Sequence, residues 1–203
     1  MSPWAVVAVL SGLGFAILAV AARTAPYLPF DPPVSHAIQS YEAEWLHMLA
    51  GAVSWVGFPP QVDVLVVVLA LAFWLSGRRR QATGVILAGA SAGGLYLLVQ
   101  LLVQQPRPSP DLVRVASSLP TGAFPSGHET TFTAVLGFLA YVGWTHARGR
   151  LVGWSCVCGA ALFLVLMAWA RLYQGDHWLS DLAGGLLLGS FCLALTVLGC
   201  GRS

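Results

Sequence analysis

Residues 151–200 read LVGWSCVCGAALFLVLMAWARLYQGDHWLSDLAGGLLLGSFCLALTVLGC, two long apolar runs separated by a short polar stretch. The runs Leu151–Ala170 and Leu182–Gly201 reach or approach the roughly 20 residues that an α-helix needs to cross a bilayer. The stretch between them places an arginine, two aspartates and a histidine together in a chain that is only 9% charged. Charged groups are costly near hydrocarbon, so the pattern predicts two membrane helices joined by a functional segment.

Similar apolar runs recur along the whole chain. Hydrophobic residues make up 57% of it and the mean hydropathy is +0.76, well above the range of soluble proteins. We therefore predict an all-α polytopic membrane protein, a bundle of six transmembrane helices that forms a single domain over residues 1–203. The predicted spans are Trp4–Ala22, Pro60–Gly77, Ala82–Gln105, Thr130–Thr145, Leu151–Ala170 and Leu182–Gly201.

The placement of arginines predicts the orientation of this bundle. All ten basic residues are arginines, and several follow the second, fourth and sixth predicted spans, namely Arg78, Arg79, Arg80, Arg148, Arg150 and Arg202. By the positive-inside rule these ends are cytoplasmic, so both termini are expected inside. We assign the arginine run this topological role in preference to nucleic-acid binding.

One segment differs in composition from the spans. From Pro33 to about Trp55 the chain mixes apolar, aromatic and polar residues, which is typical of an amphipathic helix at a membrane interface. We predict one such helix at the outer face. Its titratable residues are expected on a solvated side, and they are His36, Glu42, Glu44 and His47.

Counting crossings from the cytoplasmic arginines brings three distant polar stretches to the outer face. The third span ends there at QQPRPSPD with Arg107, and the fourth begins there after FPSGHET with Ser126 and His128. The fifth span ends there at RLYQGDHWLSD. This convergence favours one shared site over three unrelated loops.

The PSGHET stretch predicts an anion site at a helix start. Ser126 followed three residues later by Glu129 fits a capping box, and Gly127 allows a close backbone approach. Free N–H groups and the helix dipole at such a terminus favour a bound anion. His128 in the first turn could move a proton near neutral pH.

The other two stretches supply complementary groups. Prolines on both sides hold Arg107 on a stiff tether, and a guanidinium suits phosphate oxygens. His177 and Asp181 are spaced i,i+4, so the aspartate could fix the tautomer of a histidine that acts as a nucleophile or base. Arg171 brings a second positive charge, whereas Asp176 falls on another side and is expected in solvent.

Taken together, Arg107-Pro108, Pro125-Ser126-Gly127-His128 and Arg171 with His177 and Asp181 resemble the signature of the type 2 phosphatidic acid phosphatase superfamily. That signature is K-x6-RP, PSGH and SR-x5-H-x3-D, and here it lies within residues of about 100–181. Two positions depart from it. Gln100 stands at the position of the lysine and brings no charge, and Ala170 replaces the serine. Phosphate binding or substrate preference should therefore differ, or Arg114 should compensate.

The resemblance implies a lipid phosphatase of the bacterial cytoplasmic membrane with its active site facing outward. His177 would attack phosphorus, with Asp181 orienting it and His128 as acid and base. The phosphate would be held by Arg107, Arg171, Ser126, Gly127 and Gln100. No cofactor or metal is expected, because the sequence has no acidic or His/Cys cluster of suitable spacing.

The expected substrate is a lipid phosphate or diphosphate of the undecaprenyl diphosphate, phosphatidylglycerophosphate or phosphatidic acid type, and the bilayer itself is the other partner. The sequence leaves protein partners open. Alternatives are a phosphotransferase that uses the same phosphohistidine and a catalytically impaired membrane protein. A transporter would instead place polar residues at the middle of several helices.

Overall fold

α-Helices form the regular structure of the computed structural model, which describes residues 1–117, 121–147 and 149–200. No β-strand occurs in these ranges, so the all-α prediction is confirmed for them. The helices are α1 (Pro3–Thr24), α2 (Asp31–Gln39), α3 (Glu44–Trp55), α4 (Gln61–Leu75), α5 (Arg79–Val103), α6 (Gly127–His146), α7 (Arg150–Tyr173) and α8 (Leu179–Cys200).

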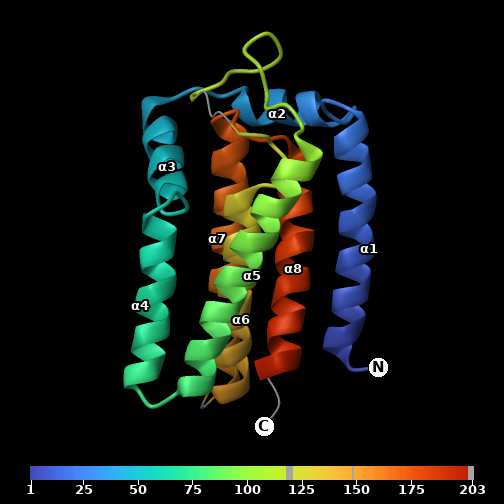
Figure 1. The fold of residues 1–203 in the computed structure, drawn as a ribbon. Coiled ribbons are helices and arrows are strands. Elements are labelled where there is room, and N and C mark those ends of the chain that lie inside the picture. The colour runs from blue at the N-terminus through green and yellow to red at the C-terminus, as the bar shows by residue number, and fades with distance from the viewer. Residues whose placement is uncertain (118–120, 148, 201–203) are drawn as a thin grey trace.

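Four of these helices, α1, α5, α7 and α8, are long and apolar enough to cross a membrane. They coincide with four of the predicted spans to within a few residues at each end. The other two predicted spans correspond to α4 and α6, of which α4 is a shorter apolar helix of 15 residues. In Figure 1, α3 stands above α4 on the same side of the bundle, so the two helices together form a column as long as their neighbours.

The predicted single helix from Pro33 to about Trp55 is wrong, because the chain forms two helices there. α2 lies across one end of the bundle, whereas α3 runs along the bundle and packs against α7 (Figure 1). The side chain of Gln39, the last residue of α2, donates to the carbonyl oxygens of Arg114 (2.8 Å) and Leu172 (3.2 Å). This tertiary contact fixes the end of α2 where the sequence pattern alone would continue the helix.

The centre of the bundle is α6, which packs against α5, α7 and α8. Its contact with α8 depends on small residues. A Cβ atom added to Gly185 would lie 2.8 Å from the carbonyl oxygen of Ser126, and one added to Gly189 would lie 2.6 Å from that of Thr130. The spacing of these two glycines is the small-xxx-small pattern that lets membrane helices approach closely.

The two ends of the bundle differ in character. The start of α1 at Pro3 and the end of α8 at Cys200 lie at one end, together with the turn between α4 and α5 that carries Arg78 and Arg79 (Figure 1). The connections from α5 to α6 and from α7 to α8 lie at the opposite end, which is also the end where α2 lies. The three polar stretches therefore meet at the end away from the arginine run.

A buried aspartate ties α2 to the start of α8. Asp31 is fully buried, and its carboxylate accepts hydrogen bonds from the backbone N–H (2.9 Å) and the hydroxyl (2.7 Å) of Ser180. It also accepts from the backbone N–H of Leu28 at 2.7 Å. Since a helix start has N–H groups without partners inside the helix, Asp31 caps α8 from a distant part of the chain.

Substituting Asp31 should destabilise the end of the bundle that holds the polar stretches. Asp31→Ala leaves buried donors on Ser180 and Leu28 without an acceptor, which should cost about 2–3 kcal/mol. The melting temperature in detergent should fall by about 5–10 °C. Asp31→Asn keeps one acceptor oxygen and should lose less, so equal melting of Asp31→Ala and the wild type would contradict this role.

Candidate active site

The segment after α5 is held beside the segment before α6. Gln104, the residue that follows α5, adopts a left-handed conformation with φ of 52°. The next carbonyl, that of Gln105, accepts from the backbone N–H of Ala123 at 2.8 Å. Arg107 then donates from Nε to the Thr121 carbonyl oxygen (2.9 Å) and from Nη2 to its hydroxyl (3.1 Å). These contacts fix the direction of the Arg107 guanidinium.

The start of α6 is capped as the sequence predicts, but only in part. Ser126 is the N-cap residue, and its hydroxyl accepts from the backbone N–H of Glu129 at 3.4 Å. The reciprocal half of a capping box does not form, because Ser126 donates its own N–H to the carbonyl oxygen of Asp181 at 3.0 Å. Ser126 thus anchors α6 to the first turn of α8.

His177 lies between the two charged groups that orient it. Nη1 of Arg107 lies 3.3 Å from Nε2 of His177. Arginine can only donate, so Nε2 is the unprotonated nitrogen and Nδ1 carries the hydrogen. Nδ1 faces Oδ2 of Asp181 at 3.4 Å, and the same oxygen accepts from the backbone N–H of Trp178 at 2.7 Å. The lone pair of Nε2 is therefore directed to the arginine side.

Burial and neighbouring charge keep His177 neutral. Burial lowers the pKa of His177 well below its usual value, and the positive charges of Arg107 and Arg171 lower it further. A neutral imidazole has the free lone pair that a nucleophile needs.

His128 is oriented by the segment between α3 and α4. Nε2 of His128 lies 3.0 Å from the carbonyl oxygen of Ser54, which can only accept, so Nε2 carries the hydrogen and Nδ1 is free. The ring of Phe58 meets the imidazole edge-on with 4.7 Å between centroids. A Cβ atom on Gly57 would overlap the His128 ring, so only glycine leaves room for this orientation.

Arg171 is almost completely buried, with 1% of its side chain exposed. Nη1 pairs with Oδ2 of Asp176 at 2.9 Å and donates to Oε1 of Gln174 at 3.3 Å. Nε and Nη2 have no hydrogen-bond partner in the described part of the chain. Buried donors are normally satisfied, and oxygens of an anion would satisfy these two.

The expectation that Asp176 lies in solvent is wrong. Its side chain is 2% exposed, because it pairs with Arg171 and accepts from the hydroxyl of Ser117 at 2.8 Å. Its backbone carbonyl oxygen also accepts from Nη1 of Arg107 at 2.6 Å. The i,i+4 spacing places residues only on the faces of α8. Asp176 precedes that helix, and its side chain turns toward Arg171 of α7.

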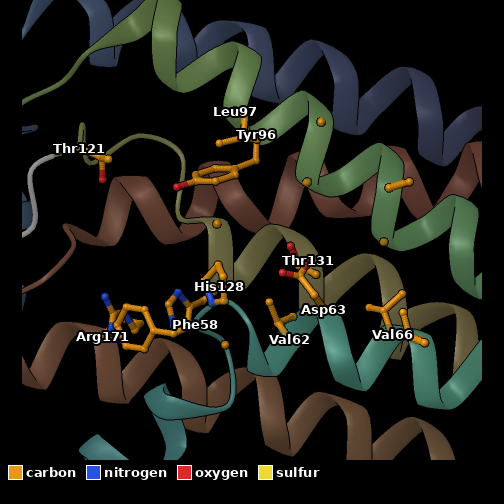
Figure 2. Close-up of a pocket in the computed structure, with 18 of the residues that line it drawn as sticks. Phe58, Val62, Asp63, Val66, Tyr96, Leu97, Thr121, His128, Thr131 and Arg171 are labelled. Carbon is orange, nitrogen blue, oxygen red and sulfur yellow. The ribbon is translucent and has the colours of Figure 1, made fainter.

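These groups border a cavity of about 670 Å³. Figure 2 shows Arg171, Phe58 and His128 at one end of it, with Val62 and Val66 of α4 farther along. On the α5 side the cavity wall includes Tyr96 and Leu97. The rest of this wall is formed by Ile86 and the small residues Gly89, Ala90, Gly93 and Gly94. The polar end is lined by Arg107, Thr121, Gly127, His128, Arg171 and His177. The cavity therefore joins a cationic, histidine-containing end to an apolar channel between two helices.

Some predicted site residues do not line this cavity. Gln100 donates from Nε2 to the carbonyl oxygen of Gly122 at 2.9 Å and so supports the loop before α6. Ser126 is fully buried behind the cavity wall. Arg114 does not compensate for the missing lysine, because it pairs with Glu42 at 2.9 Å and donates to the carbonyl oxygen of Gln39 at 3.2 Å.

Sequence reasoning missed several residues of the cavity. Gly57 and Phe58 could have been noticed, because the two prolines that follow them interrupt an apolar run. Nothing in the local sequence marks Tyr96 or Thr121. No group of three His, Cys, Asp or Glu side chains suited to a metal ion occurs within the described ranges.

Known proteins resemble this chain in sequence and in fold. The family model of the PAP2 superfamily matches residues 81–202. The putative undecaprenyl-diphosphatase YbjG of Escherichia coli (strain K12) is 31% identical over 148 residues, which cover 67% of this chain and 68% of that protein. The range that the family model matches includes Arg107, Thr121, Gly127, His128, Arg171 and His177, but not Gly57 or Phe58.

Two solved structures share the fold. The first transmembrane PAP2 type phosphatidylglycerolphosphate phosphatase from Bacillus subtilis superposes with a TM-score of 0.81 at 22% identity, covering 93% of each chain. LpxE of Aquifex aeolicus gives a TM-score of 0.68 at 20% identity, covering 84% of this chain and 96% of that one. With its sequence matches, this protein belongs to the PAP2 superfamily of membrane phosphatases.

Proposed function

We propose that the protein hydrolyses a phosphate monoester or diphosphate of a lipid at the outer face of the membrane, through a phosphohistidine and without a metal. The observation that carries this proposal is the arrangement at the polar end of the cavity. The buried guanidinium of Arg171, with its unpartnered donors, and the partly buried guanidinium of Arg107 lie beside the unprotonated Nε2 of His177.

In the first step, Nε2 of His177 attacks phosphorus as the bond from phosphorus to the leaving oxygen breaks. In this step His128 starts protonated on both ring nitrogens: the leaving oxygen takes the proton of Nδ1, while the Nε2–H stays bonded to the Ser54 carbonyl. Arg107, Arg171 and the first backbone N–H groups of α6, on Gly127 and His128, stabilise the charge on the other oxygens. Asp181 stabilises the positive charge that develops on His177.

In the second step, neutral His128 removes a proton from water, and the water oxygen attacks phosphorus as the bond to His177 breaks. Inorganic phosphate leaves, and both histidines return to their starting states. The two arginines supply the positive charge that a metal ion supplies in other phosphoryl-transfer sites.

The apolar part of the cavity supports a lipid substrate. Val62, Val66 and Leu97 line the channel between α4 and α5, where a hydrocarbon tail would bury apolar surface (Figure 2). The names of the relatives point to two of the substrate types expected from the sequence, undecaprenyl diphosphate and phosphatidylglycerophosphate, and phosphatidic acid stays an expectation from the sequence.

For the membrane we propose six spans, with α4 and α6 added to the four long apolar helices. The end with Arg78, Arg79 and Arg80 then faces the cytoplasm, as do the start of α1 and the end of α8. The active site opens at the outer face, where α2 lies across the bundle as an interfacial helix (Figure 1). The break between α3 and α4 is tolerated at this depth because its backbone lines a cavity.

Removing the nucleophile should abolish activity without unfolding the protein. His177→Ala should lower the release of inorganic phosphate from a lipid phosphate by at least about a thousandfold. The assay uses purified protein in detergent with EDTA, and no phosphate acceptor other than water.

His36→Ala is the matched control, because His36 is exposed near the same end of the bundle but lies outside the cavity. It should retain wild-type activity. Phosphate release by His177→Ala at the wild-type rate would refute the assignment, and a need for an added acceptor would point to a phosphotransferase.

A small substitution beside His128 should affect catalysis more than binding. Gly57→Ala adds a methyl group where the His128 ring lies, so the general acid should shift and kcat should fall by about tenfold to a hundredfold. KM should change much less. Gly51→Ala is the control, because a Cβ atom there meets nothing within 4 Å; similar kcat values for the two variants would contradict the role of Gly57.

A further inference from the structure

An unexplained carboxylate lies in the wall of the cavity. Asp63 is in the first turn of α4, beside Val62, and it is the one acidic side chain among the described residues that line the cavity. It forms no ion pair within the described ranges. An ionisable residue that faces a cavity in an otherwise apolar stretch of a membrane protein calls for a functional explanation.

Asp63 lies where the proposed substrate would place the part of its leaving group next to the reacting phosphate. In Figure 2, Asp63 lies between His128 and Val66 along the cavity, which Thr131 of α6 also lines. If phosphorus lies at His177 and the leaving oxygen at His128, the leaving group passes Asp63 before its tail enters the apolar channel. In a monoester this portion is uncharged, whereas in a diphosphate it is the second phosphate.

The positive charge of the cavity is sufficient for one phosphate. Arg107 and Arg171 are its only arginine or lysine side chains among the described lining residues. Arg171 already pairs with Asp176 at 2.9 Å. Gln100, which stands at the position of the family's lysine, is uncharged and donates to the carbonyl oxygen of Gly122. The described lining residues therefore include no further arginine or lysine that could bind a second phosphate, and the carboxylate of Asp63 would repel it.

We propose that Asp63 makes the enzyme select lipid phosphate monoesters over lipid diphosphates, by placing negative charge where the second phosphate of a diphosphate would lie. This inference rests on the proposed function, because it assumes that phosphorus binds between His177, Arg107 and Arg171. It narrows the substrate to a lipid that carries a single terminal phosphate with an uncharged group next to it.

Farnesyl phosphate and farnesyl diphosphate test this selection, because the two lipids share one tail and differ by one phosphate. Purified full-length protein in detergent with EDTA, which prevents a divalent cation from bridging Asp63 and the diphosphate, is assayed for kcat/KM on each. Chromatography of farnesyl phosphate and farnesol separates the first hydrolysis from the second. The wild type should prefer the monophosphate, and Asp63→Asn should raise the diphosphate-to-monophosphate ratio by about tenfold.

Matched variants separate charge from shape. Asp63→Ala also removes the charge and should raise the ratio, whereas Asp63→Glu keeps the charge and should preserve it. Thr131→Val changes an uncharged neighbour in the same cavity and should leave the ratio as in the wild type. An unchanged ratio in both Asp63→Asn and Asp63→Ala overturns the inference.

The result also distinguishes this inference from the proposed function. If hydrolysis of farnesyl phosphate depends on His177 while the neutral Asp63 variants keep the wild-type ratio, only the role of Asp63 fails. If wild type and His177→Ala release phosphate equally, the proposed function fails and the role of Asp63 fails with it.

Discussion

Ser126 donates its backbone N–H to the carbonyl oxygen of Asp181 at 3.0 Å, and this contact joins the starts of α6 and α8. The carboxylate of the same aspartate accepts from Trp178 and faces Nδ1 of His177. One residue at the first turn of α8 thus positions both the helix start that offers N–H groups and the histidine that we propose as nucleophile. The small residues Gly185 and Gly189 allow this contact, because larger side chains would hold the two helices apart.

The other charged and catalytic side chains are held in place by separate contacts. Arg107 and His128 bond to backbone carbonyl oxygens, and Arg171 pairs with a buried carboxylate. Arg107 is directed by the carbonyls of Thr121 and Asp176, and His128 by that of Ser54. Arg171 is held by a buried ion pair with Asp176. Removing one partner of such a pair leaves an uncompensated buried charge, so the cationic end of the cavity depends on Asp176 although that residue does not line it.

Much of the fold could be predicted from the sequence, because the lengths of the apolar runs and the positions of the arginines can be read from the sequence directly. The four long spans and the meeting of three polar stretches at one end follow from them. The environment of Asp176, the use of Gln100 to hold the Gly122 carbonyl and the approach of Phe58 to His128 depend on tertiary contacts. The break between α2 and α3 has the same origin, because Gln39 binds carbonyls that are distant in sequence. The periodicity of residues along the sequence does not predict such contacts between distant segments.

The central claim is that the arginines and His177 surround one phosphorus atom. It is tested most directly by a structure of the protein with vanadate, which mimics a phosphoryl group during transfer. We expect vanadium bonded to Nε2 of His177, with oxygens that accept from Arg107 and from Nε and Nη2 of Arg171, and with Nδ1 of His128 facing the opposite apical oxygen. Vanadate bound away from His177, or bonded to His128 instead, would contradict it.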